Sequence, residues 1–337
     1  MRKNGRNDAL CLFVRERALC RKLQYRVMES AMAFPPFIGY NASGRGAALK
    51  KIWSLCLILA ILLSMGVPRV YAANEGLPEE DGYSLWLRYP EISDPAYRET
   101  ARAALSYLVS PTEEDAVILS SFQELERGLD SLFGEAVSRK SGIEEDGAIL
   151  LGTGANPDVA AAVDAGVLAS LDREGYRIQT VLCRGKKTTV VAGGGPNGVL
   201  YGAFKLLEMI QCREDVTEID FADSPKIQWR VLDQWDNWNG SIERGYAGSS
   251  IYKWDELPDK VDSRYEDFAR ANASIGINTI VINNVNTQTN YIRTENLPKI
   301  KAIADVFRKY GIRLALTVRF DSPIAIGGLG TADPLDD

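Results

Sequence analysis

The chain has 337 residues, of which 46% are apolar and 25% charged, and it contains no histidine. This length and composition predict a globular protein of two or three domains and exclude the disordered, collagen-like and disulfide-scaffold classes. Without histidine, the chain has no Ser-His-Asp or Cys-His mechanism and no histidine-ligated zinc. Any chemistry must therefore use carboxylates, the backbone or a cofactor.

The start of the chain differs in charge from the rest. Segment 1–72 carries a net charge of +9, whereas segment 73–337 carries −15. An acidic body argues against nucleic acids and anionic membrane surfaces as partners.

The basic segment contains the three parts of a secretory signal peptide. Two lysines precede the apolar run 52–67, and small residues stand at the −3 and −1 positions of a cleavage site after Ala72. The run is shorter than the roughly 20 residues of a membrane span, which favours a cleaved signal over an uncleaved anchor. We expect a signal peptide over 50–72 and a secreted or cell-surface protein without further membrane association. Residues 1–49 are interpreted as a spurious extension or a leader.

Segment 79–225 predicts an α+β domain. Cys183 and Cys212, its two cysteines, could form a disulfide in an exported protein or remain two buried free thiols. The turn 184–187 between two alternating segments predicts an antiparallel hairpin. The expected elements are strands over 83–89, 148–152, 176–182 and 188–192, and helices over 95–109, 113–133, 157–171 and 199–212.

A glycine-rich stretch joins the last of these strands to the last helix. Gly193, Gly195 and Gly198 satisfy the G-x-G-x-x-G pattern of dinucleotide-binding proteins. The alternative is a tight turn in which glycine permits positive φ. The hairpin before this stretch favours the turn, and no clear parallel strand with a ribose-binding acid follows the helix.

Segment 226–337 changes to alternating strands and helices. Apolar strands separated by capped helices predict βα units and a parallel sheet. A (β/α)8 barrel needs about 250 residues, and this segment has room for only three βα units. We therefore expect the first three βα units of a truncated (β/α)8 TIM barrel. Its expected strands cover 229–235, 278–283 and 313–319, and its helices cover 264–275 and 297–310.

An aromatic, polar loop over 235–248 follows the first of these strands, on the face where such barrels build their sites. Its tryptophans, amides and charged side chains suit a sugar, which presents apolar C–H faces and a rim of hydroxyl groups. The alternative is a structural loop whose tryptophans plug the barrel mouth and whose Glu243 and Arg244 form a local ion pair. Segments 283–286 and 319–323 end the other two strands with side chains suited to hydroxyls and a carboxylate, or to turns.

Several long motifs stand out in the chain, at 81–89, 240–248, 270–278, 283–286 and 327–335. They closely resemble those of the bacterial and fungal α-glucuronidases of glycoside hydrolase family 67. The resemblance extends from residue 79 to the last residue. It implies an N-terminal domain like that of β-hexosaminidases, a central (β/α)8 barrel and a helical C-terminal domain.

The resemblance also implies an activity, the inverting hydrolysis of (4-O-methyl-)glucuronic acid α-1,2-linked to xylo-oligosaccharides in xylan degradation. It implies no metal and no cofactor. Inversion needs one carboxylic acid and one opposed carboxylate. In the family these come from later barrel strands, so we expect no catalytic residue within this chain and no activity of the chain alone.

The site residues implied by the resemblance belong to the sugar pocket. Trp235 is expected to form a wall, and Asn284 and Val285 to stand at the end of the second strand. Glu243 and Arg244 are expected to support the loop over 235–248, called the pocket loop below. The expected partner is the xylo-oligosaccharide substrate, and a homodimer of the full-length protein stays open. The alternative function is a noncatalytic carbohydrate-binding relic of the same family.

Overall fold

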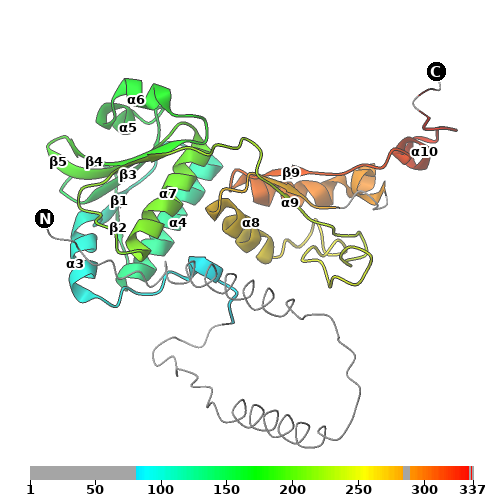
Figure 1. Ribbon diagram of the computed structural model, residues 1–337, viewed down its shortest axis with the longest axis horizontal. Coiled ribbons are helices and arrows are strands. Elements are labelled where there is room, and N and C mark those ends of the chain that lie inside the picture. The colour runs from blue at the N-terminus through cyan, green and yellow to red at the C-terminus, as the bar shows by residue number, and fades with distance from the viewer. Residues whose placement is uncertain (1–80, 284–288, 334, 336–337) are drawn as a thin grey trace, which may run out of the picture. The chain divides into compact units, whose positions relative to one another are not determined.

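The computed structural model describes residues 81–283, 289–333 and 335 (Figure 1). The chain divides into two compact units, and the architecture below is that of the second, Ser84–Asp337. The expected signal peptide and the extension before it lie outside the described residues. Within the described ranges, no helix is long and apolar enough to cross a membrane.

The N-terminal part is built on a six-stranded mixed sheet in the order β2-β1-β3-β5-β4-β6. Strands β1, β2, β3 and β5 run parallel, and β4 runs antiparallel to both β5 and β6. The strands are β1 (Tyr107–Val109), β2 (Ser138–Lys140), β3 (Ala148–Thr153), β4 (Tyr176–Cys183), β5 (Lys186–Gly193) and β6 (Asp220–Asp223). The predicted hairpin between 176–182 and 188–192 is confirmed as β4–β5.

Helices cover both faces of this sheet (Figure 1). Because successive strand residues face opposite sides, Ile149 and Leu151 of β3 join one apolar cluster, while Ala148 and Leu150 join another. The first cluster is closed by α4 (Ala116–Phe133) and α7 (Pro196–Gln211), and the second by α5 (Pro157–Ala162) and α6 (Ala165–Ser170).

The prediction of a strand over 83–89 is wrong. The segment forms the 3₁₀ helix η1 (Leu85–Arg88), in which Leu85 and Tyr89 adopt positive φ values of 52° and 44°. Leu87 and Tyr89 are buried, whereas Tyr83, Leu85, Trp86 and Arg88 are exposed, so the alternation in the sequence reports burial only in the second half of the segment. It does not report strand pairing, which depends on a neighbouring strand.

Two predicted helices are each divided into two elements. Segment 95–109 gives α3 (Pro95–Ala104) followed by β1, because the short apolar run at its end is buried between two neighbouring strands. Segment 157–171 is interrupted at Val163, and the Asp164 carboxylate caps a new helix by accepting from the amides of Gly166 and Val167. Short apolar runs do not distinguish strand from helix by periodicity alone.

The sequence analysis missed β2 and β6, which form the two edges of the sheet. Both strands are largely exposed and rich in charged residues. Natural edge strands commonly carry such charge because it discourages pairing with another chain. The same charge hides them from a search for apolar alternation.

The C-terminal part contains the expected parallel sheet, in the order β7-β8-β9. Its strands are β7 (Val231–Asp233), β8 (Thr279–Val281) and β9 (Arg313–Ala315), each shorter than predicted. The connecting helices are α8 (Arg264–Ser274) and α9 (Leu297–Arg308), and the short α10 (Ser322–Gly327) follows β9. This arrangement confirms the alternating βα pattern. Closure into a barrel stays a prediction.

A buried ion pair joins the two parts. The Arg270 guanidinium of α8 donates to both carboxylate oxygens of Glu124 in α4, at 2.6 and 2.8 Å, and to the carbonyl of Leu87. The Tyr89 hydroxyl donates to the same carboxylate at 2.6 Å, because burial, together with the Glu124 charge, raises the pKa of Tyr89 and keeps its proton in place. Two motifs of the resemblance, 81–89 and 270–278, therefore meet at this contact.

The glycine-rich turn is filled by protein. A Cβ atom on Gly194 would lie 2.1 Å from the carbonyl oxygen of Asp172, and one on Gly198 would lie 2.2 Å from that of Gly175. The chain 172–175 thus occupies the space that a pyrophosphate would need. This contact, with the antiparallel β4–β5 pairing, rejects the dinucleotide hypothesis in favour of the tight turn. The positive φ expected for that turn is not found at Gly193, Gly195 or Gly198, and close backbone contacts are what require glycine here.

The two cysteines of the described part are not bonded to each other. Cys183 is buried at the end of β4, and Cys212 is exposed just after α7. Of the two alternatives left open by the sequence, the described structure shows the free thiols, of which only Cys183 is buried.

Candidate functional site

The carboxyl ends of β7, β8 and β9 meet at one edge of the C-terminal sheet. The register pairs Asp233 with Val281 and Val281 with Ala315. The residues that follow each strand therefore gather on the face where parallel βα folds place their sites.

Asn283 and Thr317 lock two of these strand ends together. The Asn283 side chain accepts from the Thr317 amide and donates to the Thr317 carbonyl, both at 2.9 Å. The Thr317 hydroxyl donates to the carbonyl of Asn283 at 2.9 Å. Asn283 is buried, so its amide holds the sheet edge. The predicted site residues Asn284 and Val285 follow it directly and lie outside the described residues.

Trp235 stands two residues beyond β7 with its ring half exposed. Its indole Nε1 donates to the Asp233 carboxylate at 3.3 Å. This bond satisfies the polar end of the ring and fixes its orientation. An exposed, oriented aromatic face is the kind of surface on which an apolar sugar face packs.

Glu243 is brought against Trp235 by the fold of the pocket loop. The Glu243 amide donates to the Trp235 carbonyl at 2.7 Å, and the Asn237 side chain donates to the Glu243 carbonyl at 2.6 Å. Glu243 adopts φ +57°, which reverses the chain here, and its carboxylate accepts from the Tyr246 hydroxyl. Arg244 follows at the exposed tip of the turn. The described contacts of Glu243 are thus those of a residue that shapes the loop.

Behind this loop lies a packed aromatic cluster. Trp238 stacks on Trp254 with ring centroids 4.8 Å apart, and Tyr291 meets both rings edge-on at 5.2 and 5.1 Å. Tyr252 packs against Trp254 at 5.5 Å. The sequence analysis noted Trp238 but missed Tyr252, Trp254 and Tyr291. The alternation of Tyr252 and Trp254 in the sequence was the one pattern that could have indicated part of this cluster. The cluster supports the pocket loop from beneath, while Trp235 stays at its surface.

Asp236 is buried at the base of the loop. One carboxylate oxygen, Oδ1, has no hydrogen-bond partner among the described residues, and the backbone carbonyl accepts from the Tyr291 hydroxyl at 3.1 Å. Burial raises the pKa of the Asp236 carboxyl, and a hydrogen bond from Ser250 partly opposes this shift. A carboxyl sealed in this way does not reach a substrate.

Three carboxylates of this edge are each bonded to a neighbouring side chain or buried. Asp233 accepts from the Trp235 indole, Asp236 is sealed from solvent, and Glu243 accepts from Tyr246. Across the part of the chain that the structure describes, no cluster of three or more cysteine, aspartate or glutamate side chains is placed to hold a metal ion. What the described residues present at this edge is the half-exposed ring of Trp235.

Two family models match the described chain almost from end to end. The "Glycosyl hydrolase family 67 N-terminus" matches residues 85–206, and the "Glycosyl hydrolase family 67 middle domain" matches residues 209–337. The chain belongs to glycoside hydrolase family 67. The boundary between the two models falls within α7, and the expected domain boundary at residue 225 stays a prediction.

Curated relatives of this family 67 chain carry the same assignment. It is 37% identical over 289 residues to "Probable alpha-glucuronidase A" of Neosartorya fischeri, covering 85% of this chain and 32% of the relative. It is 34% identical over 268 residues to "Alpha-glucuronidase A" of Emericella nidulans, covering 77% of this chain and 31% of the relative. The chain therefore spans about a third of the length of these relatives.

Proposed function

We propose that this chain forms part of an α-glucuronidase that removes (4-O-methyl-)glucuronic acid α-1,2-linked to xylo-oligosaccharides, by inverting hydrolysis, in xylan degradation. The observation that carries the proposal is the family 67 match combined with the half-exposed Trp235 at the carboxyl edge of β7–β9. The printed names of the relatives support a glucuronidase.

The chain's own contribution, in this proposal, is to bind and orient the uronyl ring. Trp235 presents an aromatic face whose polar end is already bonded to Asp233. Glu243 and Asn237 hold the loop that carries it. A wall that is fixed before the substrate arrives lowers the entropy lost on binding and places the glycosidic oxygen in a defined position.

The carboxylic acid and the opposed carboxylate of an inverting mechanism stand about 6.5–9.5 Å apart and both reach the glycosidic bond. In the described structure, Asp233 accepts from the Trp235 indole, Glu243 accepts from the Tyr246 hydroxyl, and Asp236 is buried. We therefore propose that these three carboxylates are structural. Substitution of Glu243 by glutamine would then alter the affinity for a uronide without removing an acid or a base.

A noncatalytic carbohydrate-binding relic is the alternative, and the relatives' names do not favour it. Both functions require the same sugar wall.

The test is a calorimetric titration of the chain with aldotriouronic acid (glucuronic acid α-1,2-linked to a xylose oligomer), combined with an assay of released glucuronic acid. We expect saturable binding that Trp235→Ala weakens about tenfold, the effect of losing one aromatic contact. We expect no release above the buffer rate. Absence of binding would contradict the proposed site, whereas release by the chain alone would contradict the structural role of its carboxylates.

A further inference from the structure

A cavity of about 860 Å³ lies at the opposite ends of the strands, where the amino ends of β8 and β9 meet the N-terminal part. Its lining includes the turn 172–174, the start of α7, residues 224–228 before β7, and the end of α9. This volume is within the range of natural ligand sites, about 300–1,000 Å³. The cavity is separated from Trp235 by the length of β7.

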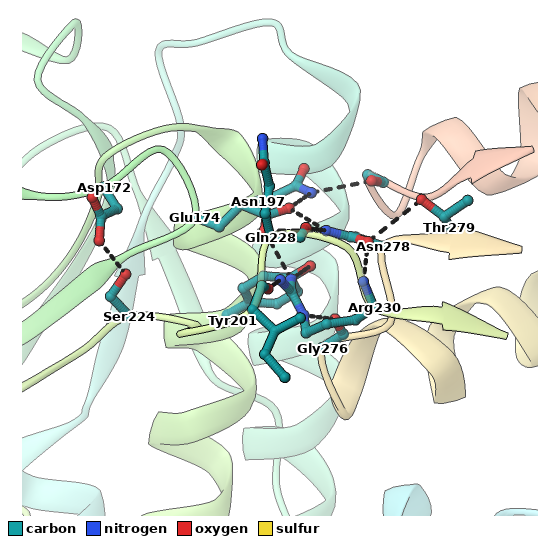
Figure 2. A network of polar contacts seen from close by, with 12 residues as sticks. Asp172, Glu174, Asn197, Tyr201, Ser224, Gln228, Arg230, Gly276, Asn278 and Thr279 are labelled. Carbon is teal, nitrogen blue, oxygen red and sulfur yellow. Dashed lines mark hydrogen bonds and ion pairs between the residues drawn. The ribbon is translucent and has the colours of Figure 1, made fainter.

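A hydrogen-bond network fixes the walls of this cavity (Figure 2). The Glu174 carboxylate accepts from the Arg230 guanidinium at 2.9 Å, from the Asn278 amide at 3.2 Å and from the Asn197 amide at 3.2 Å. Asn197 also donates to the carbonyl of Gly311 at 3.1 Å. These bonds join β7, β8, α7 and the start of β9, so the cavity is formed in advance of any ligand.

Other polar groups of the lining are still available to a ligand. Arg173, Lys226 and Gln228 are exposed, and their side chains have no hydrogen-bond or ion-pair partner in the ranges that the structure describes. Asp172 uses one carboxylate oxygen to accept from Ser224 at 2.7 Å. Donors and acceptors are both present, as hydroxyl groups require.

The charges of the lining nearly cancel. Arginine and lysine side chains at residues 173, 226, 308 and 313 line the cavity together with aspartate and glutamate side chains at 115, 172 and 174. Such a balance does not favour a strongly charged ligand of either sign. It favours an uncharged molecule with many hydroxyl groups.

An exposed tryptophan lies beside the cavity, outside the residues that line it. Trp229 is 55% exposed, and the guanidinium of Arg313, a lining residue, lies 4.8 Å from the centre of its ring. This cation–π contact holds the ring in one orientation. Trp229 is thus linked to the lining through Arg313 and through its chain neighbour Gln228.

We propose that this cavity and Trp229 form a second carbohydrate site, which binds neutral pyranose rings of an oligosaccharide backbone. Trp229 provides the aromatic platform, and Gln228, Lys226 and Asp172 bond the hydroxyl groups. This goes beyond the proposed function, because the site lies at the other end of β7 from Trp235 and needs no uronyl group. Its role is to hold a sugar chain away from the uronide pocket.

The experiment titrates the full chain with xylohexaose, an uncharged β-1,4-linked pentose oligomer, and follows tryptophan fluorescence. We expect saturable binding whose Kd rises about tenfold in Trp229→Ala, because one aromatic contact is lost. The matched control is Trp86→Ala, which removes a similarly exposed ring (48%) outside both proposed sites and is expected to leave this Kd unchanged. Gln228→Ala, which keeps the ring, is expected to weaken binding in the same direction.

Titration with D-glucuronate separates this proposal from the proposed function, since Trp229→Ala is expected to leave that binding unchanged. The proposal is overturned if xylohexaose does not bind, or if Trp235→Ala weakens its binding while Trp229→Ala and Gln228→Ala do not. It is also overturned if sulfate binds in competition with xylohexaose, because the cavity is then an anion site.

Discussion

Ionisable side chains are buried at two places in the fold, and the two places differ in whether the polar atoms have hydrogen-bond partners. Arg270 and Glu124 are a buried pair with hydrogen bonds to most of their polar atoms. Asp236 is a buried carboxyl with an oxygen that has no partner in the described structure. The sequence identified Arg270 as part of a motif, but its partner lies 146 positions away, a distance that local pattern does not bridge.

Replacing Arg270 by alanine is expected to lower the free energy of unfolding by about 3–5 kcal/mol, because Glu124 would be left buried without its cation. Urea denaturation measures this change. The matched control is Lys301→Ala in the exposed pair Lys301–Asp305, for which the expected loss is about 0–1 kcal/mol. Equal losses in the two variants would show that the buried pair does not join the two parts as described. The double variant Glu124→Leu/Arg270→Met is expected to be more stable than Arg270→Ala.

Asp236 is expected to make stability depend on pH. Its pKa in the folded state is raised by burial above the unfolded value of about 3.9, so the folded state binds more protons between these two values. The stability that the protonated Asp236 carboxyl gives the folded state is therefore fully present below about pH 4. It is lost as the pH rises through the folded-state pKa. Asp236→Asn is expected to remove this decline, so its stability relative to the parent should increase with pH.

The companion variant for Asp236 is Ser250→Ala. It removes a hydrogen bond that opposes the pKa shift, so the decline in stability should extend to higher pH. Denaturation curves collected from pH 4 to pH 8 test both variants. Parallel pH profiles for Asp236→Asn and the parent would mean that this carboxyl is not sealed in solution.

At the level of elements, long helices were predicted well and short strands poorly. Helices α4, α7, α8 and α9 coincide closely with the predicted segments, since each carries an apolar face over many turns. The strands β7, β8 and β9 have three residues each, too few for a period to identify their ends. The edge strands β2 and β6 were missed because a solvated edge has no apolar face.

The β5–α7 turn allows a test at this scale. Alanine in a helix normally gains about 0.5–1 kcal/mol over glycine. At Gly198, however, the new Cβ would lie 2.2 Å from the carbonyl oxygen of Gly175. Because backbone must move to relieve that contact, Gly198→Ala is expected to lose about 1–3 kcal/mol by thermal denaturation. Gly142→Ala, where nothing lies within 4 Å, is expected to change stability by less than about 0.5 kcal/mol. If Gly198→Ala is as stable as the parent protein or more stable, close packing does not explain why glycine stands in this turn.

For the whole molecule, the sequence predicted the family and the two kinds of sheet, because its motifs are long and its βα rhythm is regular. It placed Trp235 and Glu243 in one loop, and the structure joins them through a backbone hydrogen bond. It did not predict the aromatic support from Tyr252, Trp254 and Tyr291, or the cavity at the other end of β7. Both depend on contacts between segments that are distant in sequence.

The central claim is that the carboxyl edge of β7–β9 binds the uronide through Trp235. Oxidative footprinting with mass spectrometry tests it most directly, because Trp86, Trp229 and Trp235 are similarly exposed, at 48%, 55% and 44%, and serve as controls for one another. With D-glucuronate at saturation, we predict that oxidation slows at Trp235 and is unchanged at Trp86 and Trp229. Unchanged oxidation of Trp235 while the ligand is bound would contradict the account.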